Sequence, residues 1–382
     1  MIYLDNAASS WPKPDTVIEA MVSYMQDSGG NPGRSGHQLS VEAGRIVYNA
    51  RESVARLFNV SDPLRVIFAM NATHALNIAL KGTLKPGDRV VTTSVEHNSV
   101  MRPLRALEKQ GVNLEIVKCG PSGEIDIADW KKALAGGAKL AVAVHASNVT
   151  GRIFPITELT EAAHNAGVKI LIDAAQTAGV EKIDLQSMGI DILAFTGHKA
   201  MLGPQGTGGL VIGESVNPSE INPIMRGGTG SASSSEEQPD FLPDKFESGT
   251  PNGVGIAGLG AGARWIAERG LDNIRAHHDD LMRRLVSGLM EIEKVRVYGP
   301  RADERRAGLV SFSIAEHENS DVGLTLDEEY KIMCRVGLHC APAAHKTIGT
   351  FADGTIRFSI GPMTTAQDID LALQAVEEIA SR

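Results

Sequence analysis

The sequence predicts an α/β protein with a large domain, built on a mostly parallel seven-stranded sheet covered by helices, and a smaller α+β domain. Between about residues 66 and 212, short apolar runs alternate with helical stretches, which is the pattern of a parallel sheet with helices on both faces. After about residue 308, apolar and polar residues alternate at period two. The 382 residues, 42% of them hydrophobic, are enough for a large core and more than one domain.

The N-terminal part of the chain predicts an extended segment followed by two amphipathic helices, at residues 15–27 and 40–58. The polar, glycine-rich connector at residues 29–37 is typical of a loop over a site. The seven strands of the large sheet are expected at residues 66–69, 89–93, 114–118, 138–145, 168–173, 191–196 and 209–212.

The middle of the chain contains two further patterns. The serine-rich segment 231–239 has no periodicity and is expected to be a mobile loop. A helical run then begins at residue 254 and continues to 292, with Gly258, Gly260 and Gly262 near its start. Helix packing explains these glycines better than a dinucleotide site, because no strand precedes them.

The smaller domain follows from the last part of the sequence. Its strands are expected at residues 308–314 and 355–360, and its helices at 322–335 and 365–380. We therefore expect an N-terminal segment that packs with the small domain at residues 1–15, a large domain at 16–255 and the small domain at 256–382.

The charge balance disfavours two classes of partner. The chain has 37 basic and 46 acidic residues, a net charge of −9 and no cluster of lysine or arginine along the sequence. Neither nucleic acid nor an anionic membrane is therefore an expected partner. No apolar stretch approaches the roughly 18 residues of a membrane helix, and the first residues lack the basic and apolar regions of a signal peptide. A cytoplasmic protein is expected.

The three cysteines are expected to be free thiols, because they are too few and too irregularly spaced for a disulfide framework. Cys340 lies in a predicted loop beside His339 and near Arg335, neighbours that favour the nucleophilic thiolate. Burial as a small hydrophobic side chain fits Cys119 and Cys334 better. His339, Cys340 and His345 match no common zinc spacing, so no metal site is expected.

Two predicted strands end in residues that suit a pyridine aldehyde cofactor. Asp173 closes the strand 168–172, and the strand 191–195 leads to Lys199, so that both reach the same edge of the sheet, where open α/β sheets bind ligands. A carboxylate there can keep a pyridinium nitrogen protonated, and an amine there can form a Schiff base, which together indicate pyridoxal phosphate. A helix cap and a surface lysine are the alternatives. The glycine-rich turn at 203–209 argues against a surface lysine.

Three other positions are candidates for binding the rest of such a cofactor and its substrate. Thr73 and the amides at the start of a short helix at 75–81 suit a phosphate, although a capped helix without ligand explains them equally well. His97 follows the strand 89–93 and can stack on the ring, or it is an ordinary packed histidine. Arg357 offers a planar fork for a carboxylate, with a surface ion pair as the alternative.

As an ordered set, these motifs resemble the cysteine desulfurase branch of the class V aminotransferases, pyridoxal phosphate enzymes of fold type I. The resemblance runs from Tyr3-Leu4-Asp5-Asn6-Ala7-Ala8 to Arg357 and covers nearly the whole chain. The Arg-x-Gly-x-x-Cys-Ala sequence around Cys340 is similar to the second group of desulfurases, which includes selenocysteine lyase-like members.

The resemblance implies a role for each matching residue. Lys199 would form the Schiff base, Asp173 would face the pyridinium nitrogen, and Gln176 would donate to the ring hydroxyl. His97 would stack on the ring, and Thr250, within residues 246–252, would reach the phosphate of a neighbouring subunit, which makes a homodimer necessary. The remaining implied roles are phosphate binding by Ala72, Thr73, Thr196 and His198, substrate binding by Asn148, Arg357, Arg335 and His37, and persulfide formation on Cys340.

The expected activity is therefore conversion of L-cysteine to L-alanine, with the sulfur held as a persulfide on Cys340 and passed to an acceptor protein. A selenocysteine lyase and a class V aminotransferase acting on another small amino acid remain alternatives, as does a scaffold protein that has lost catalysis. The identity of the sulfur acceptor and the destination of the sulfur stay open.

Overall fold

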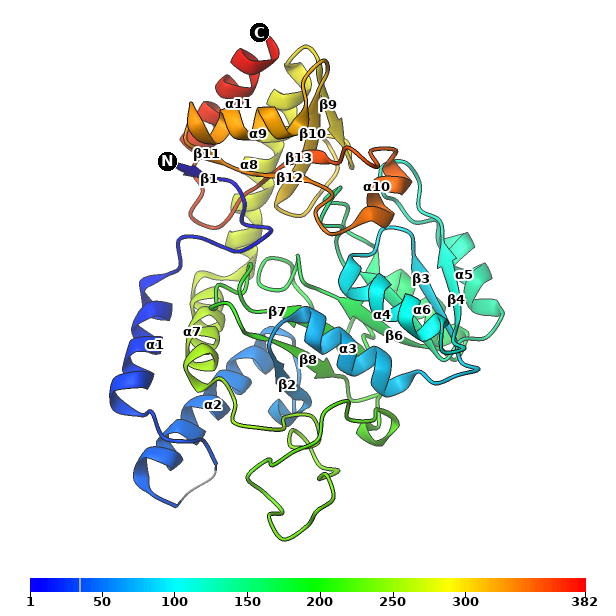
Figure 1. The fold of residues 1–382 in the computed structure, drawn as a ribbon, viewed down its shortest axis with the longest axis vertical. Helices are drawn as coiled ribbons and strands as arrows, with labels where there is room; N and C mark the ends of the chain where they lie inside the picture. Colours follow the sequence, from blue (N-terminus) through cyan, green and yellow to red (C-terminus); the bar gives the residue numbers. More distant parts are fainter. Residues whose placement is uncertain (34–35) are drawn as a thin grey trace.

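The large lobe of the protein is built on a mostly parallel sheet. The structure is a computed structural model that describes residues 1–33 and 36–382, and Figure 1 shows a small lobe of C-terminal elements above a larger lobe. Within the described residues, the larger lobe holds a seven-stranded sheet in the order β2-β8-β7-β6-β5-β3-β4, in which only β8 pairs antiparallel with its neighbours. The predicted sheet is confirmed. Its strands are β2 (Val66–Ala69), β3 (Arg89–Thr93), β4 (Asn113–Val117), β5 (Leu140–Val144), β6 (Lys169–Asp173), β7 (Ile192–Thr196) and β8 (Gly208–Ile212).

The strands at the centre of this sheet are apolar on both faces because helices cover both. Along β5, Leu140 and Val142 pack into one apolar cluster, whereas Ala141 and Ala143 pack into another. A parallel sheet that is buried on both faces requires such continuous apolar runs. The helices of the large lobe are α1 (Asp15–Asp27), α2 (Gln38–Leu57), η1 (Pro63–Arg65), α3 (Ala72–Thr83), α4 (Asn98–Glu108), α5 (Ile127–Ala135), α6 (Ile156–Asn165), η2 (Pro218–Glu220) and α7 (Gly253–Arg269).

The small lobe has a core of its own. In the part of the chain that the structure describes, its sheet has four antiparallel strands in the order β12-β13-β10-β9. Leu285, Phe312 and Val376 belong to the apolar cluster between this sheet and its helices. The elements of this lobe are α8 (Leu271–Glu291), β9 (Val295–Tyr298), β10 (Leu309–Ile314), α9 (Asn319–Glu328), β11 (Ile332–Met333), β12 (Arg335–Gly337), α10 (Pro342–Ile348), β13 (Thr355–Ser359) and α11 (Ala366–Ala380).

The N-terminal segment bridges the two lobes. Its strand β1 (Ile2–Tyr3) pairs with β11 of the small lobe, and Asn6 Nδ2 donates to the carbonyl oxygen of Ser359 at 3.2 Å. Farther along, Ser10 Oγ donates to the carbonyl oxygen of Lys199 in the large lobe at 2.8 Å. The chain therefore crosses from one lobe to the other before α1 begins.

The division into domains stays a prediction. Ile274, near the start of α8, belongs to an apolar cluster of the large lobe, whereas Leu281 of the same helix belongs to the small-lobe cluster. This packing favours a boundary within α8, later in the chain than residue 255.

The glycines of α7 allow close helix packing, as the sequence predicts. A side-chain carbon at Gly258 would lie 2.8 Å from Met21 Cγ of α1, and one at Gly260 would lie 2.6 Å from Ala50 Cβ of α2. Both distances are shorter than carbon atoms tolerate. Glycine is therefore needed where α7 crosses α1 and α2.

Two helix predictions in the C-terminal part are wrong in detail. The helix expected at 322–335 ends at Glu328, and β11 and β12 take its second half. Lys331, between α9 and β11, has a φ of 57°, which a helix cannot contain. Pairing with β1 and β13, which lie far away in sequence, outweighs the local helical pattern. The long helical run to residue 292 is also broken, by Gly270 with a φ of 82°.

Two expected loops lie outside the lobes' regular elements. Residues 221–252, which include the serine-rich segment, contain no helix or strand, and the mobility expected of that segment stays a prediction. The connector expected at 29–37 precedes α2, and Arg34 and Ser35 within it lie outside the described residues. Among the helices that the structure describes, none combines the length and apolar character needed to cross a membrane.

A buried ion pair fixes the segment that carries Thr250 to the sheet. Glu247 Oε1 and Oε2 accept hydrogen bonds from Arg51 Nη1 and Nη2 at 2.7 and 2.8 Å. Glu247 Oε1 also accepts from the amide of Phe68, on the edge strand β2, at 2.6 Å. The Arg51 side chain is only 4% exposed, so the pair ties α2, β2 and this segment together.

We expect Glu247→Ala to destabilise the protein by about 3 kcal/mol, because it removes the only carboxylate that pairs with the buried guanidinium of Arg51 among the described residues. Urea unfolding followed by circular dichroism measures the change. Glu42→Ala, which removes the exposed partner of Arg45, is the control and should leave the unfolding midpoint unchanged. Equal effects of the two substitutions would contradict this role of Glu247.

Candidate active site

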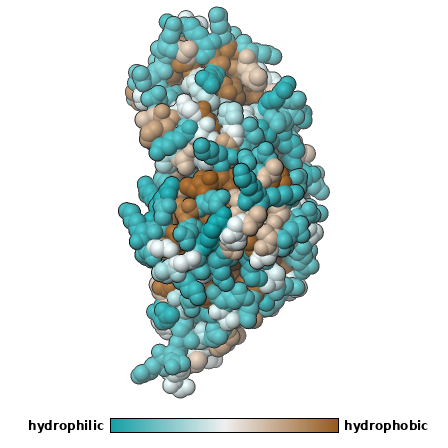
Figure 2. All heavy atoms as spheres, turned by 90° about the vertical axis from the view of Figure 1, so that its right-hand side faces the viewer, coloured by the Kyte–Doolittle hydropathy of each residue, from teal (hydrophilic) through white to brown (hydrophobic). Residues whose placement is uncertain are grey.

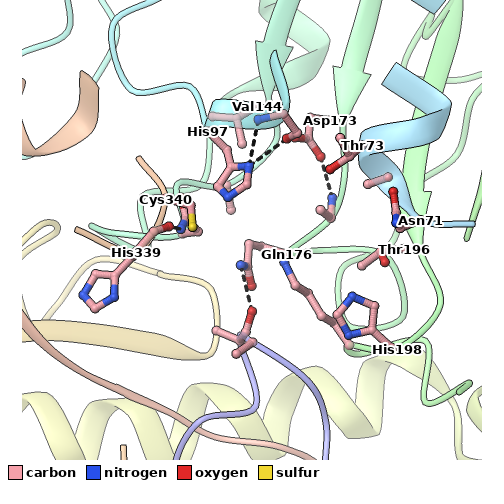
Figure 3. A pocket seen from close by; sticks show the side chains of 18 of the residues that line it. Asn71, Thr73, His97, Val144, Asp173, Gln176, Thr196, His198, His339 and Cys340 are labelled. Atoms are coloured by element: carbon pink, nitrogen blue, oxygen red, sulfur yellow. Dashed lines mark hydrogen bonds between the residues drawn. The ribbon is translucent and has the colours of Figure 1, made fainter. Parts of the chain in front are cut away.

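A cavity of about 250 Å³ lies where the carboxyl ends of the central strands face the small lobe. Figure 3 shows side chains from the large sheet, from α3 and from the small lobe pointing into it. The residues that line it include most of those singled out from the sequence: Ala72, Thr73, His97, Asn148, Asp173, Gln176, Thr196, His198, Lys199, Arg335, Cys340 and Arg357.

Lys199 and Asp173 are the charged pair at the base of this cavity. Asp173 is the last residue of β6 and is 1% exposed, and its Oδ1 accepts from the amide of Ala175 at 2.9 Å. Burial raises the pKa of Asp173, although Ala175 and Lys199 oppose this effect. Burial also lowers the pKa of Lys199 to about 8, helped by the guanidinium groups of Arg357 and Arg335. The neutral, nucleophilic amine is therefore a much larger fraction of Lys199 near neutral pH than of an ordinary lysine.

His97 is held as a neutral ring. It caps the N-terminus of α4, and its Nδ1 accepts from the amide of Ser99 at 3.0 Å and lies 2.7 Å from Ser99 Oγ. Burial lowers the pKa of His97 to about 3, together with Lys199, Arg335 and other nearby cations. An uncharged imidazole fixed at one ring nitrogen is suited to stacking on an aromatic ligand.

The start of α3 and the end of β7 form a candidate anion site. The first amides of a helix have no partner within the helix, and they carry a partial positive charge. Thr73 lies there and lines the same cavity as Thr196 and His198. Thr196 Oγ1 and His198 Nδ1 are buried and have no hydrogen-bond partner within the described residues. Buried polar atoms of this kind usually have a partner, and a phosphate would supply one.

Arg357 forms a second anion site on the small lobe. Its side chain is 2% exposed, and its Nη2 contacts Asp5 Oδ1 at 3.1 Å. Its Nη1 donates to the carbonyl oxygen of Asn148 at 3.0 Å, whereas Arg357 Nε and Asn148 Oδ1 have no partner among the described residues. Arg335 lies directly opposite Arg357 in the β12–β13 pair. Two neighbouring guanidinium groups with one carboxylate leave room for a further anion.

Cys340 lies on the opposite side of the cavity from Thr196 and His198, as Figure 3 shows. His339 and Cys340 both have positive φ angles, 48° and 57°, so the loop is tightly wound there. Two hydrogen bonds to its carbonyl oxygens hold the loop: the amide of Asn98 donates to Cys340 at 2.9 Å, and the side-chain Nδ2 of Asn148 donates to His339 at 2.7 Å. Arg335 Nη2 lies 3.7 Å from Cys340 Sγ, which places a cation beside the exposed sulfur.

The other two cysteines differ from Cys340. Both are half-buried, and burial raises the pKa of Cys119 to about 11 and that of Cys334 to about 12. They remain thiols at neutral pH, as expected from the sequence. Within the described residues, no group of three or more His, Cys, Asp or Glu side chains is placed to hold a metal ion.

Two of the predicted site residues do not line this cavity within one chain. Thr250 lies in a separate depression with Met70 and Asn252, where its Oγ1 accepts from Asn31 Nδ2 at 3.4 Å. His37 is exposed and caps α2 through its Nδ1, which accepts from the amide of Ser40 at 3.2 Å. Their predicted roles stay predictions.

The structure adds site residues that the sequence reasoning missed. Asp5 pairs with Arg357, the carbonyl of Ala7 accepts from Gln176 Nε2 at 3.2 Å, and Ser99 fixes His97. Ser99 stands two residues after His97, a spacing that signals a helix cap. Asp5 and Ala7 belong to the N-terminal segment that carries the family resemblance, but their partners lie more than 160 residues away, 352 for Asp5 and 169 for Ala7.

Comparison with known proteins identifies the family. The sequence matches the family described as Aminotransferase class-V over residues 2–372. The chain belongs to this family. Two curated relatives of this class-V aminotransferase are named probable cysteine desulfurase: one from Methanothermobacter thermautotrophicus, 35% identical, and one from Pyrococcus abyssi, 36% identical, each over 99% of this chain and 94% of the relative.

Solved structures agree with this family assignment. The apo structure of a cysteine desulfurase from Thermococcus onnurineus has a TM-score of 0.93 and 35% identity, and the match covers 100% of this chain and 94% of that one. The predicted fold type I architecture and the resemblance to cysteine desulfurases are thereby confirmed. Membership of their second group stays a prediction.

Class-V aminotransferases depend on pyridoxal phosphate, and the cavity fits this group. The unpartnered Thr196 Oγ1 and His198 Nδ1 suit its phosphate. Asp173 suits its ring nitrogen, the neutral His97 ring suits one face of its ring, and the Lys199 amine suits its aldehyde. The hydrogen-bond donors that the cofactor needs, and the one acceptor, Asp173, thus line one cavity.

The lowered pKa of Lys199 has a measurable consequence in the cofactor-free protein. The neutral amine reacts with formaldehyde and cyanoborohydride, so methylation of Lys199 should rise with pH, with a midpoint near pH 8. Peptide mass spectrometry follows the modification. In Asp173→Asn the midpoint should move to lower pH, because Asp173 raises this pKa. A midpoint near 10.5, the value of an unperturbed lysine, would contradict the buried position.

Proposed function

We propose that this protein is a pyridoxal phosphate-dependent cysteine desulfurase that converts L-cysteine to L-alanine and retains the sulfur as a persulfide on Cys340. The observation that carries this proposal is the position of Cys340, which lines the same cavity as Lys199 and Asp173. The names of the curated relatives support it. A class V aminotransferase acting on another amino acid would have no need of an exposed thiol there.

The cofactor would be held by residues from several elements. Lys199 would bind its aldehyde, Asp173 its ring nitrogen and Gln176 its ring hydroxyl, while His97 would cover one face of the ring. When bound, pyridoxal phosphate supplies an electron-withdrawing ring that stabilises negative charge at the substrate α-carbon. The phosphate would lie against the start of α3, with Ala72, Thr73, Thr196 and His198.

The chain's own residues would orient and activate the substrate. Arg357 and Asn148 would hold its carboxylate, since a guanidinium fork binds carboxylates with fixed geometry. The neutral Lys199 amine would take the α-proton, the step for which its lowered pKa prepares it. Arg335 would keep a positive charge beside the Cys340 sulfur.

Sulfur transfer would then take place on Cys340. The Cys340 thiolate attacks the substrate sulfur, the carbon–sulfur bond breaks as a sulfur–sulfur bond forms, and the electrons of the broken bond stay with the substrate carbon. Protonation of that carbon gives alanine. The sum is cysteine plus the Cys340 thiol giving alanine plus the Cys340 persulfide, without an external oxidant.

A second subunit is part of this proposal. Thr250 does not line the cavity of its own chain. It lies in a depression near the start of α3, where it could reach the cavity of a second copy of the chain. We propose a homodimer in which Thr250 of each chain completes the phosphate site of the other. His37, exposed at the start of α2, would approach substrate in the same way.

Incubation with L-cysteine and pyridoxal phosphate tests the activity. We expect alanine to form and the Cys340 peptide to gain the mass of one sulfur atom, detected by mass spectrometry. Cys340→Ser should lower alanine formation at least about 100-fold, because it removes the nucleophile. Cys334→Ser, which removes a half-buried thiol, should retain the parent rate. Alanine release by Cys340→Ser at the parent rate would exclude the persulfide role.

Substitution of Arg357 tests carboxylate recognition. We expect Arg357→Ala to lower kcat/KM for L-cysteine about 10- to 100-fold, as for loss of a hydrogen-bonded charged partner. The loss should be much smaller for L-cysteine methyl ester, which has no carboxylate. Arg296→Ala, an exposed arginine of the same sheet, is the control. An equal loss for acid and ester would mean that Arg357 acts on the fold rather than on the carboxylate.

A further inference from the structure

A broad groove lies beside the cysteine loop, on the outer face of the molecule. It has a volume of about 760 Å³ and runs between α4 and α10, over the end of β4. We call it the α4–α10 groove. Figure 2 turns this side of the molecule toward the viewer and shows apolar surface near its middle, bordered by hydrophilic side chains. The apolar floor of the groove is formed by Met101, Ala106, Ile116, Pro342 and Ala343.

The rim of this groove is basic, although the chain carries a net charge of −9. Five exposed cations come from three separate segments, so that no cluster is visible along the sequence. Of these five, only Arg105 forms an ion pair within the described residues, and its partner is Glu108. Lys346 packs on the ring of Phe351. The five are Arg102, Arg105, Lys109, Lys118 and Lys346.

The groove lies next to the loop that carries Cys340. Asn98, at its edge, donates its amide proton to the Cys340 carbonyl at 2.9 Å. Pro342 and Ala343 of the floor follow Cys340 by two and three residues. A ligand seated in the groove would therefore lie against the loop that presents the Cys340 sulfur. The thiol in the groove, Cys119, has a pKa raised to about 11 by burial and stays protonated.

We propose that the α4–α10 groove docks an acidic segment with apolar side chains, belonging to the protein that takes sulfur from Cys340. An apolar floor requires apolar contacts, and a cationic rim on an acidic protein favours an anionic partner. These two features together favour a protein over a nucleic acid, which offers phosphates without apolar side chains. This inference rests on the proposed function.

The transfer itself is balanced without any further reactant. A thiolate of the docked segment attacks the outer sulfur of the Cys340 persulfide. A sulfur–sulfur bond forms to the acceptor as the bond to Cys340 breaks, and Cys340 leaves as a thiolate, ready for the next cysteine.

Three synthetic peptides, each with a single cysteine, serve as acceptors to test the proposal. The first contains glutamate, leucine and serine, the second replaces each glutamate by lysine, and the third replaces each leucine by serine. Alanine release is measured with each peptide as the sulfur acceptor, and with dithiothreitol as a small uncharged one. We expect the acidic, leucine-containing peptide to support the fastest turnover, and its advantage to shrink as salt is added.

Charge reversal on the rim locates the binding site. Lys109→Glu with Lys118→Glu should slow transfer to the acidic peptide about tenfold and speed transfer to the lysine peptide. Turnover with dithiothreitol should be unchanged, because neither residue lines the catalytic cavity. Arg283→Glu with Arg296→Glu makes the same change in net charge on the small lobe, away from the groove, and should behave as the parent protein.

Each outcome bears on one proposal. If turnover with dithiothreitol is absent, the proposed function fails. If that turnover is intact but both charge-reversal variants respond alike, the groove is not the docking site. Equal rates of transfer to the acidic peptides with leucine and with serine would contradict a role for the apolar floor. A thiol-tagged RNA that accepts sulfur as fast as the acidic peptide would overturn the assignment to a protein partner.

Discussion

The structure depends on one constraint: a lysine and an aspartate must both be buried at the edge of a sheet, and both must remain functional there. Asp173 ends β6, and Lys199 lies in the turn after the adjacent parallel strand β7, so strand pairing brings both to the same edge of the sheet. Burial acts on both in opposite directions, since it lowers the pKa of the amine and raises that of the acid. The surrounding cations Arg357 and Arg335 add to the effect on Lys199. Packing thus makes the Lys199 amine reactive, and no separate base is needed to deprotonate it.

The large lobe and its part of the site could be predicted from the sequence because their determinants are local. Continuous apolar strands such as 140–144 mark a sheet buried on both faces, and the rule that ligands bind at the carboxyl ends of strands then places Asp173 and Lys199 together. The glycines of α7 were correctly assigned to helix packing for the same kind of reason, since a glycine cluster without a preceding strand has few other uses.

What the sequence did not predict arises from contacts between distant segments. The helix expected at 322–335 fails because β1 and β13 offer pairing partners more than 300 and about 20 residues away, respectively. The ion pair of Asp5 with Arg357 joins residues 352 apart. The basic rim of the α4–α10 groove has the same origin, because its cations come from α4, from the end of β4 and from α10. A scan along the chain finds no cluster, whereas folding assembles one.

The register of β12 against β13 sets two guanidinium groups, Arg335 and Arg357, directly opposite each other, an arrangement that weakens a sheet when nothing lies between the charges. Asp5 balances Arg357, and it comes from the N-terminal segment, whose strand β1 pairs with β11 of the same lobe. Under the proposed function, the carboxylate of an amino acid held by Arg357 would add a second negative charge beside this pair. Such a ligand would also stabilise the small lobe, so that occupancy of the site and rigidity of that lobe would rise together.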